Sequence, residues 1–357
     1  MKILIDIGHP AHVHLFKNFG WEMQKRGHEI LFTCRQKEYE IELLESAGFH
    51  YKCLGKHFKT KKGKILGLFK FNFLLLLTAI KFKPDLYLSH GSIYAAHVAW
   101  LLRRPHIALE DSGNMEQIRL YLPFTRVILT PDILPVDLGT KQICYTGYHE
   151  IAYLHPDHFT ADKQIVEDLG IGKECDYVLL RFVSWDATHD TGHHGISMEG
   201  KNKLFDYLNS CGLKIIISSE KKLPDSLDAY SYKFPPDKLH HVLAFAKIVI
   251  SEGATIASEA GVLGIPTIYV NTIERCYNED QQKYGLVYNF RSEKGIIQKI
   301  SEILDTPNTW SVWRKRRNQL LHDKINVTQF LVWFIENYPD SENIMRKNPD
   351  SQLTFRK

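Results

Sequence analysis

The chain has 357 residues, which is enough for two domains of ordinary size. Its 44% hydrophobic and 24% charged residues are typical of a globular protein, and a net charge of +4 gives no case for a nucleic-acid partner. Six scattered cysteines form no C-x-x-C pair, so they predict neither a zinc site nor a disulfide framework. Together with an N-terminus that passes directly into a strand, they favour a cytoplasmic protein.

The first half of the chain alternates strand-like and helix-like segments. Strands are expected at residues 2–7, 29–34, near 51, 86–89, 106–109 and 126–129. Helices are expected at residues 13–26, 37–47, 65–82 and 94–102. Strands that alternate with helices of this length predict a parallel sheet covered on both faces.

The same pattern restarts after a group of turn formers near residues 147–157. Strands are expected at 177–182, 214–218, 246–250 and 267–270, and helices at 201–210, 240–245, 254–263 and 310–337. Two such arrays predict an α/β protein with two Rossmann-like domains, whose parallel sheets face each other across a cleft. The expected boundaries are an N-terminal domain at 1–152, a linker at 153–172, a C-terminal domain at 173–323, a helix at 324–338 and a loosely held polar tail at 339–357.

The loop after the first strand is rich in histidine. His9, His12 and His14 follow Gly8 within six positions, at the carboxyl edge of the sheet where open α/β folds bind ligands. Histidine is the side chain best suited to general-base catalysis near neutral pH. The loop therefore predicts a base or a phosphate contact, with a polar surface loop as the alternative. A metal site would need a further ligand, which the sequence does not nominate.

A basic and apolar segment runs from Lys52 to Lys83. It holds nine lysines and no acidic residue, and it encloses the apolar stretch 65–77, which Lys70 and Asn72 interrupt. This stretch is too short to span a bilayer, but its composition suits shallow insertion at an anionic membrane surface. The alternative is a core helix preceded by a lysine-rich loop. No nucleic-acid module accompanies the lysines.

Polar side chains follow two further strands. Glu110 and Asp111 come after the strand at 106–109 and would face the expected cleft. Arg181 and Ser184 hold the matching place in the second half, where the arginine would pair with a diphosphate. The loop His189–Gly195 is polar and rich in glycine and histidine, but its spacing matches no standard metal site.

The most informative segment is a strand, a glycine turn and a helix at residues 246–263. The N–H groups of Gly253, Ala254 and Thr255 and the helix dipole form a natural seat for a phosphate. Glu259 stands further along the helix, where a carboxylate would accept hydrogen bonds from ribose hydroxyls. The alternative is an ordinary βαβ crossover with Glu259 solvated on the helix surface.

These segments resemble the GT-B superfamily of nucleotide-sugar enzymes. The likeness is closest to the N-acetylglucosaminyltransferase that makes lipid II and to non-hydrolysing UDP-N-acetylglucosamine 2-epimerases, and within that group to the domain of unknown function 354 family. The segments that carry it are Gly8–Val13, Lys83–Asp111, Gly253–Pro266 and Gln281–Gln282. The lipid II transferase is also similar in having a basic, apolar patch on its first domain that faces the membrane.

The resemblance implies an inverting glycosyltransferase that transfers sugar from a UDP-sugar to a lipid-linked or cell-surface glycan precursor. It implies His12 as catalytic base, Glu259 on the ribose, and Gln281 and Gln282 on the donor sugar, with no metal or cofactor. His14 and Glu110 are further candidates for sugar contact. Attachment to the inner face of the cell membrane would fit this role.

The sequence departs from the transferase pattern at two places, and two other functions are possible for the same fold. The first loop has Pro10-Ala11 in place of a glycine run, and Glu252 stands where the transferase has a small hydroxyl residue near the diphosphate. An epimerase or hydrolase of the same fold would use carboxylates such as Asp111. A non-catalytic, membrane-associated binding protein would keep the fold without the chemistry.

Overall fold

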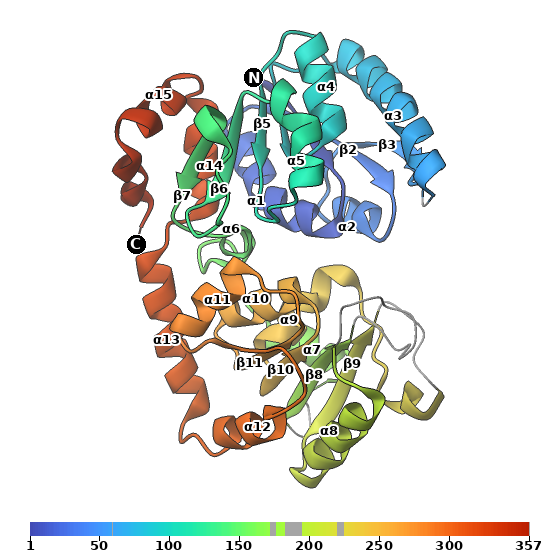
Figure 1. Cartoon of the computed structure of the whole chain (residues 1–357), viewed down its shortest axis with the longest axis vertical. Coiled ribbons are helices and arrows are strands. Elements are labelled where there is room, and N and C mark those ends of the chain that lie inside the picture. The colour runs from blue at the N-terminus through green and yellow to red at the C-terminus, as the bar shows by residue number, and fades with distance from the viewer. Residues whose placement is uncertain (59, 172–175, 183–194, 220–224, 357) are drawn as a thin grey trace. The chain divides into compact units, whose positions relative to one another are not determined.

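The computed structural model describes residues 1–58, 60–171, 176–182, 195–219 and 225–356. It divides into two compact units, and in Figure 1 the first unit carries the blue to green colours of the N-terminal residues together with the red of the C-terminal ones. Unit 1 comprises Met1–Tyr153 and Lys324–Lys357, and unit 2 comprises Leu154–Asp323. Each unit has its own parallel sheet, which confirms the predicted α/β class.

Unit 1 is built on a seven-stranded sheet in the order β3-β2-β1-β4-β5-β6-β7. Its strands are β1 (Lys2–Ile7), β2 (Glu29–Gln36), β3 (Tyr51–Lys56), β4 (Leu86–His90), β5 (His106–Leu109), β6 (Val127–Pro131) and β7 (Gln142–Tyr145). All pairings are parallel, so every strand presents its carboxyl end at the same edge. The sequence did not predict β7.

Helices cover the sheet of unit 1 (Figure 1). They are α1 (Pro10–Lys25), α2 (Glu40–Ser46), α3 (Lys61–Phe82), α4 (Ile93–Leu101), α5 (Met115–Tyr121), α6 (His149–Leu154), α14 (Val327–Glu336) and α15 (Asp340–Lys347). The helices α3 and α4 pack beside each other over β1 and β4, where Leu4 and Tyr87 join Phe71, Leu75 and Val98 in one buried cluster. Alternate strand residues turn to opposite faces, so the sheet is buried on both sides.

Helix α3 is longer than predicted. It has 22 residues, which at 1.5 Å per residue span roughly 33 Å. By length and composition, the window Ile65–Phe82 is long and apolar enough to cross a membrane, whereas the prediction of too short a stretch considered residues 65–77 alone. Only 22% of that window is buried, yet Phe71, Leu75 and Ala79 belong to the core of unit 1. The helix therefore has one apolar face in the core and a second apolar face outside it.

Unit 2 is built on a five-stranded parallel sheet in the order β12-β11-β10-β8-β9. Its strands are β8 (Tyr177–Phe182), β9 (Lys214–Ser219), β10 (Ile248–Ser251), β11 (Thr267–Val270) and β12 (Val287–Phe290). Its helices are α7 (Lys163–Asp168), α8 (Met198–Ser210), α9 (Leu239–Ala244), α10 (Ala254–Leu263), α11 (Cys276–Lys283), α12 (Ile296–Leu304) and α13 (Thr309–Asp323). The sequence predicted the four other strands but not β12.

Two predicted boundaries are wrong. The expected linker at 153–172 contains α7, and its Val166 and Ile171 are buried in the core of unit 2. The expected polar tail forms α15 and a short 3-10 helix at Pro349–Phe355. That tail is held to unit 1, because Gln352 Oε1 accepts a hydrogen bond from Thr146 N at 2.8 Å.

Candidate functional site

The loop between β1 and α1 fixes the orientation of two histidines. His9 caps α1, and its Nδ1 accepts a hydrogen bond from Ala11 N at 3.2 Å. Gly8 N donates to His12 Nδ1 at 3.2 Å. A backbone N–H can only donate, so His12 carries its own proton on Nε2. Burial, followed by the neighbouring His90, holds the pKa of His12 well below its usual range. His12 is therefore a neutral ring that donates through Nε2.

Asp111 lies between two further histidines at the carboxyl edge of the sheet. His90, the last residue of β4, places Nε2 2.9 Å from Asp111 Oδ1. His149, the first residue of α6, places Nδ1 2.9 Å from Asp111 Oδ2. The ring of His12 stacks on that of His90 with centroids 4.4 Å apart. These four residues, His12, His90, Asp111 and His149, are called the histidine–aspartate cluster below.

The electrostatics of this cluster favour an ion pair. Burial would raise the pKa of Asp111, but attraction to His149 and hydrogen bonds from His149 and His90 hold it well below its usual range. Burial opposes the charge of His90, yet the hydrogen bond and charge of Asp111 raise the pKa of His90 to about 9. Near neutral pH, Asp111 is thus ionised and His90 is protonated.

Only one of the two ring nitrogens of His149 contacts Asp111. Its Nδ1 faces Asp111, while its Nε2 is buried and bonds no group in the part of the chain that the structure describes. When Asp111 holds the Nδ1 proton of a neutral imidazole, Nε2 is left as a proton acceptor. The sequence predicted Asp111 and His12, but it missed His90 and His149.

The cluster also has the ligand types of a metal site. One atom each from His90, Asp111 and His149 lies within 4.8 Å of the others. Two imidazoles and a carboxylate suit a divalent cation such as Zn²⁺. The same atoms, however, satisfy one another through hydrogen bonds at 2.9 Å. A metal would have to replace those bonds, and a metal-independent site stays a prediction.

A buried ion pair lies beneath the β1–α1 loop. Arg35 Nη1 lies 2.7 Å from Asp6 Oδ1, and both side chains are almost fully buried. Arg35 Nη2 also donates to Ile7 O at 2.8 Å, and Ser92 at the start of α4 donates to Asp6. These bonds tie the ends of β1, β2 and β4 together next to Gly8. The signal in the sequence was a lone Asp6 inside an otherwise apolar strand.

Two predicted sugar contacts have structural partners instead. Glu110 is buried and accepts hydrogen bonds from Ser112 N at 2.7 Å and from Tyr121 Oη at 2.7 Å, so both of its oxygens already have donors. His14 lies on the buried side of α1, 6% exposed, with its ring stacked on Tyr153. The placement of these two residues does not support a direct contact with sugar.

The segment predicted to bind a phosphate lies in unit 2 and has the predicted strand, glycine turn and helix, although Gly253 N already donates to Ser251 Oγ at 3.0 Å. Gly253 follows β10 and begins α10 without a side-chain cap, and Ala254 at the first helical position is only partly buried. The first turn of a helix directs N–H groups outward and carries the positive end of the helix dipole. Arg181, at the carboxyl end of the adjacent β8, donates to Ser218 Oγ at 3.1 Å. The predicted contact Ser184 lies outside the described residues.

Glu259 lies on the buried side of α10. It is 3% exposed, and its Oε1 lies 3.1 Å from His240 Nε2. The alternative that Glu259 is solvated on the helix surface is therefore wrong. To contact a ribose, the Glu259 carboxylate must either turn away from His240 or accept hydrogen bonds from His240 and the ribose hydroxyls at the same time.

Glu252 binds the residues that follow the predicted histidine loop. Its Oε1 accepts a hydrogen bond from Ile196 N at 2.9 Å and lies 3.5 Å from Lys201 Nζ. Any side chain at Gly195 would overlap this carboxylate. Most of the loop, residues 189–194, lies outside the described residues. The contacts of the Glu252 carboxylate therefore serve the fold of unit 2.

The paired glutamines of α11 point in different directions. Gln281 is fully buried, donates to Ser258 Oγ at 2.6 Å, and occupies the space that a side chain at Gly261 would need. This packing against α10 contradicts a direct sugar contact. Gln282 is exposed and accepts a hydrogen bond from Asn289 N at 2.8 Å. Consecutive helical positions do not share a face, so the pair cannot act together.

A family model described as "Protein of unknown function (DUF354)" matches residues 1–338. An uncharacterised protein of Methanocaldococcus jannaschii is 27% identical over 281 residues, which cover 75% of this chain and 81% of that protein.

Solved structures with the same fold include both epimerases and transferases. The UDP-GlcNAc 2-epimerase of Neisseria meningitidis bound to UDP-GlcNAc superposes with a TM-score of 0.66 at 15% identity, covering 94% of this chain and 99% of that one. The glycosyltransferase SsfS6 of Streptomyces sp. SF2575 gives a TM-score of 0.59 at 14% identity, covering 94% and 100%. The predicted GT-B fold is confirmed.

Proposed function

The chain belongs to the family described as "Protein of unknown function (DUF354)", and we propose that it is a nucleotide-sugar enzyme, an inverting glycosyltransferase with a UDP-sugar donor. The observation that carries this proposal is the uncapped start of α10 directly after β10, in a chain with the GT-B fold. Similar structures support a uridine nucleotide, since the UDP-GlcNAc 2-epimerases of Neisseria meningitidis and Methanocaldococcus jannaschii were each solved with UDP-GlcNAc bound.

Unit 2 would hold the nucleotide. The first N–H groups of α10, after Gly253, would bind the diphosphate, and the dipole of that ten-residue helix would favour its negative charge. Arg181, at the end of the neighbouring strand, would add a cation. Glu259 would take the ribose hydroxyls in exchange for part of its contact with His240. Gln282 stays a candidate for the sugar because its side chain is exposed.

Unit 1 would supply proton transfer. In the displacement, the acceptor oxygen forms a bond to the anomeric carbon while the bond from that carbon to the diphosphate oxygen breaks. UDP leaves with the bonding electrons, and the proton of the acceptor hydroxyl passes to a base. We assign this base to His149, because Asp111 holds its Nδ1 and its Nε2 has no partner among the described residues. His12, predicted as the base, would instead donate its Nε2 proton to a substrate oxygen.

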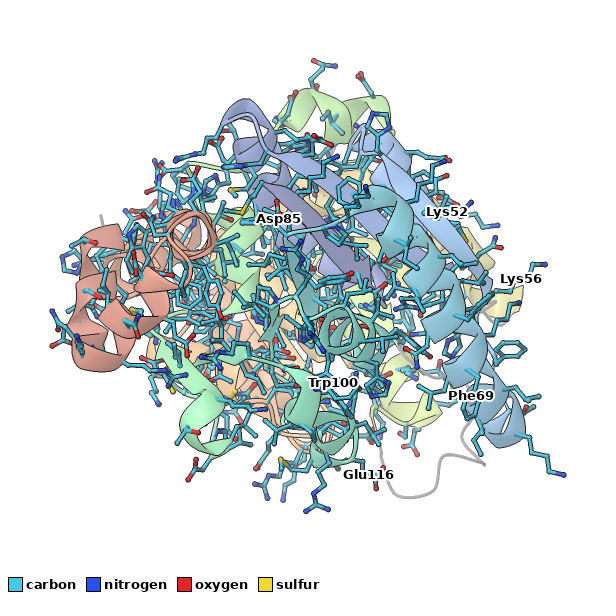
Figure 2. The ribbon with its side chains drawn as sticks, turned by 90° about the horizontal axis from the view of Figure 1, so that it is seen from above. Lys52, Lys56, Phe69, Asp85, Trp100 and Glu116 are labelled. Carbon is cyan, nitrogen blue, oxygen red and sulfur yellow. The ribbon has the colours of Figure 1, made fainter. Side chains whose placement is uncertain are left out.

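The outer face of α3 supports a lipid-linked acceptor. Its exposed apolar residues fall at helical spacing and are Ile65, Leu66, Phe69, Phe73, Leu77 and Ile80, all at least 49% exposed. Lys52 and Lys56 of β3 and Phe69 of α3 lie at the same outer edge of the view in Figure 2. An apolar face with cations beside it suits the surface of an anionic bilayer. These six residues are called the α3 outer stripe below.

An epimerase or hydrolase of the same fold is the second candidate. The observation that favours it is the pairing of Asp111 with both His90 and His149, which offers more proton-transfer groups than one displacement needs. Incubation with UDP-GlcNAc distinguishes the two. The transferase proposal predicts no change of the sugar nucleotide until a lipid-linked acceptor is added. Conversion without acceptor would identify the epimerase or hydrolase, and an absence of both binding and conversion would leave a non-catalytic binding protein.

A further inference from the structure

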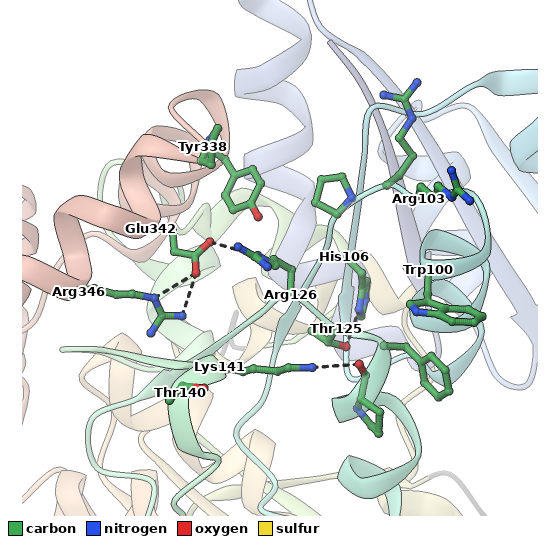
Figure 3. A pocket seen from close by; sticks show the side chains of 15 residues that line it. Trp100, Arg103, His106, Thr125, Arg126, Thr140, Lys141, Tyr338, Glu342 and Arg346 are labelled. Atoms are coloured by element: carbon green, nitrogen blue, oxygen red, sulfur yellow. Dashed lines mark hydrogen bonds and ion pairs between the residues drawn. The ribbon is translucent and has the colours of Figure 1, made fainter.

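A cavity lies within unit 1, away from the histidine–aspartate cluster. Its lining includes His106, the first residue of β5, and Arg126, which directly precedes β6 (Figure 3). These are the amino ends of the strands, whereas Asp111 follows the carboxyl end of β5. The cavity therefore opens at the opposite edge of the sheet. Its volume of about 830 Å³ is within the range of cavities that bind small organic ligands.

The lining of the cavity is strongly cationic. It contains one carboxylate, that of Glu342, and five cations, which are Arg103, Arg104, Arg126, Lys141 and Arg346. Glu342 is already paired, because Arg346 donates to its Oε1 from two nitrogens at 3.0 and 3.1 Å, and Arg126 lies 3.8 Å from its Oε2. Figure 3 shows these two arginines converging on Glu342. Arg104 also lies 3.9 Å from Asp85 Oδ1, so the lining keeps an excess of positive charge after both carboxylates are counted.

Lys141 shows how these charges affect one another. Its Nζ donates to Leu122 O at 2.8 Å and to Pro123 O at 3.0 Å, which holds the ammonium group beside the cavity. Burial, followed by repulsion from Arg126, lowers the pKa of Lys141. Cations that crowd one another in this way are stabilised by an anion placed between them.

The other wall is aromatic. Trp100 on α4 is 60% exposed. Its ring packs edge-on against that of Phe124, with the two ring centroids 5.5 Å apart. The floor is neutral, because both nitrogens of the buried His106 are bonded, to Ser89 and Thr125, and burial lowers its pKa to about 3. Arg126, Lys141 and Arg346 therefore lie on one side of the cavity, and the exposed indole of Trp100 lies on the other side, close to Arg103 (Figure 3).

We propose that this cavity binds a phosphate-bearing ligand with at least two negative charges and an apolar or aromatic group. The phosphate oxygens lie among Arg103, Arg126 and Lys141, and the apolar group lies against Trp100. Arginine suits this role because its planar group donates two parallel hydrogen bonds to a phosphate. The ligand is either a soluble phosphate ester or the headgroup of a phospholipid, and it is distinct from the nucleotide proposed for unit 2.

Titration of the full chain with phenyl phosphate, followed by calorimetry and by tryptophan fluorescence, tests the proposal. The double variant Arg103→Gln/Arg126→Gln should weaken binding at least tenfold, and Trp100→Phe should remove most of the fluorescence change. Lys25→Gln is the matched control, because Lys25 is an exposed cation on α1 of the same unit. All variants must keep the thermal midpoint of the wild type. Equal binding by the double variant and the wild type would place the probe elsewhere and overturn the proposal, as would an absence of binding by both phenyl phosphate and the vesicles below.

Vesicles separate the two sources of the phosphate. Phosphatidylcholine vesicles with and without phosphatidic acid are mixed with the wild type and the double variant, and bound protein is measured by flotation. A preference for phosphatidic acid that the double variant loses assigns the cavity to a lipid headgroup. Binding of phenyl phosphate that depends on Arg103 and Arg126, without such a preference, assigns it to a soluble ester.

Discussion

His149 Nδ1 lies 2.9 Å from Asp111 Oδ2, while Nε2 of the same ring is buried and bonds no group among the described residues. Leaving a buried acceptor unsatisfied costs about 1–3 kcal/mol. Such a cost is expected where a substrate hydroxyl completes the bond. The pair therefore has the form of a base with its orienting carboxylate, and the first three predictions concern the residues around it.

Asp111→Asn should reduce turnover by a factor of at least about 100, the scale of positioned acid–base catalysis. An amide can accept through only one of its two terminal atoms, so one histidine loses its partner. The affinity for UDP-sugar should stay within about threefold of the wild type, because the proposed nucleotide contacts belong to unit 2. A threefold change is well below the roughly 1.4 kcal/mol of binding free energy that corresponds to a tenfold change in the dissociation constant. The rate and the dissociation constant are measured separately.

Asp132→Asn provides the matched control for that variant, because Asp132 is an exposed aspartate after the next strand, β6. It should leave the rate unchanged. Treatment with EDTA should also leave the wild type unchanged. Loss of activity with EDTA that Zn²⁺ restores would assign His90, Asp111 and His149 to a metal instead.

His12→Gln should keep more activity than His12→Ala. The amide of glutamine can donate a hydrogen bond as His12 Nε2 does, but it cannot accept a proton at neutral pH. We expect His12→Gln to remain within about tenfold of the wild type, since one donated hydrogen bond contributes about 1 kcal/mol. Steady-state rates of both variants decide the role, and equal losses in both would return the base assignment to His12.

The ion pair of His90 and Asp111 should make unit 1 less stable in alkali. The pKa of His90 is raised to about 9 in the folded chain, above the unfolded value of about 6.5. Its contribution is therefore complete below pH 6.5 and is lost as the pH rises toward 9. The magnitude is on the order of 3 kcal/mol at most.

Urea denaturation between pH 6 and 10 measures that effect. His90→Gln can still donate to Asp111 but does not titrate, so its unfolding midpoint should fall less over this range than that of the wild type. Parallel curves for the two proteins would show that His90 does not titrate as the structure indicates.

The α3 outer stripe should bind anionic membranes. Phe69→Ser/Phe73→Ser removes two large exposed side chains, each of which contributes about 1.5–3 kcal/mol when fully buried. Flotation with vesicles containing phosphatidylglycerol should recover the wild type and much less of the double variant. Trp310→Ser, an exposed aromatic of unit 2, should bind as the wild type does. Flotation that does not depend on the anionic lipid, or that the double variant retains, would refute the membrane proposal.

Most strands of both sheets were predictable because they are short apolar runs between turn formers, but β7 and β12 were not predicted. The strand β7 was missed, since it has only four residues and begins with Gln142. That omission hid His149, which follows β7, from any argument based on strand ends. His90 was missed for a simpler reason, because it is the last residue of its strand rather than the first residue after it.

Burial decided most of the other differences between prediction and structure. A polar side chain next to a strand end can serve a ligand or the fold, and composition does not distinguish the two. Glu110, Glu252 and Gln281 all proved to bond to neighbouring backbone or side chains. The turn from strand to helix at Gly253 was predictable, because a glycine between a strand and a helix constrains the local geometry by itself.

Isothermal titration calorimetry of the full chain with UDP-N-acetylglucosamine tests the proposed function most directly. We predict saturable binding by the wild type, and an affinity at least about tenfold lower for Glu259→Ala, because hydrogen bonds to a charged group contribute about 1.5–3 kcal/mol. His240→Ala removes the partner of Glu259 without removing the carboxylate, so it should bind at least as well as the wild type. No heat of binding with UDP or UDP-N-acetylglucosamine at millimolar concentration, or an unchanged affinity in Glu259→Ala, would contradict the assignment of α10 as the nucleotide seat.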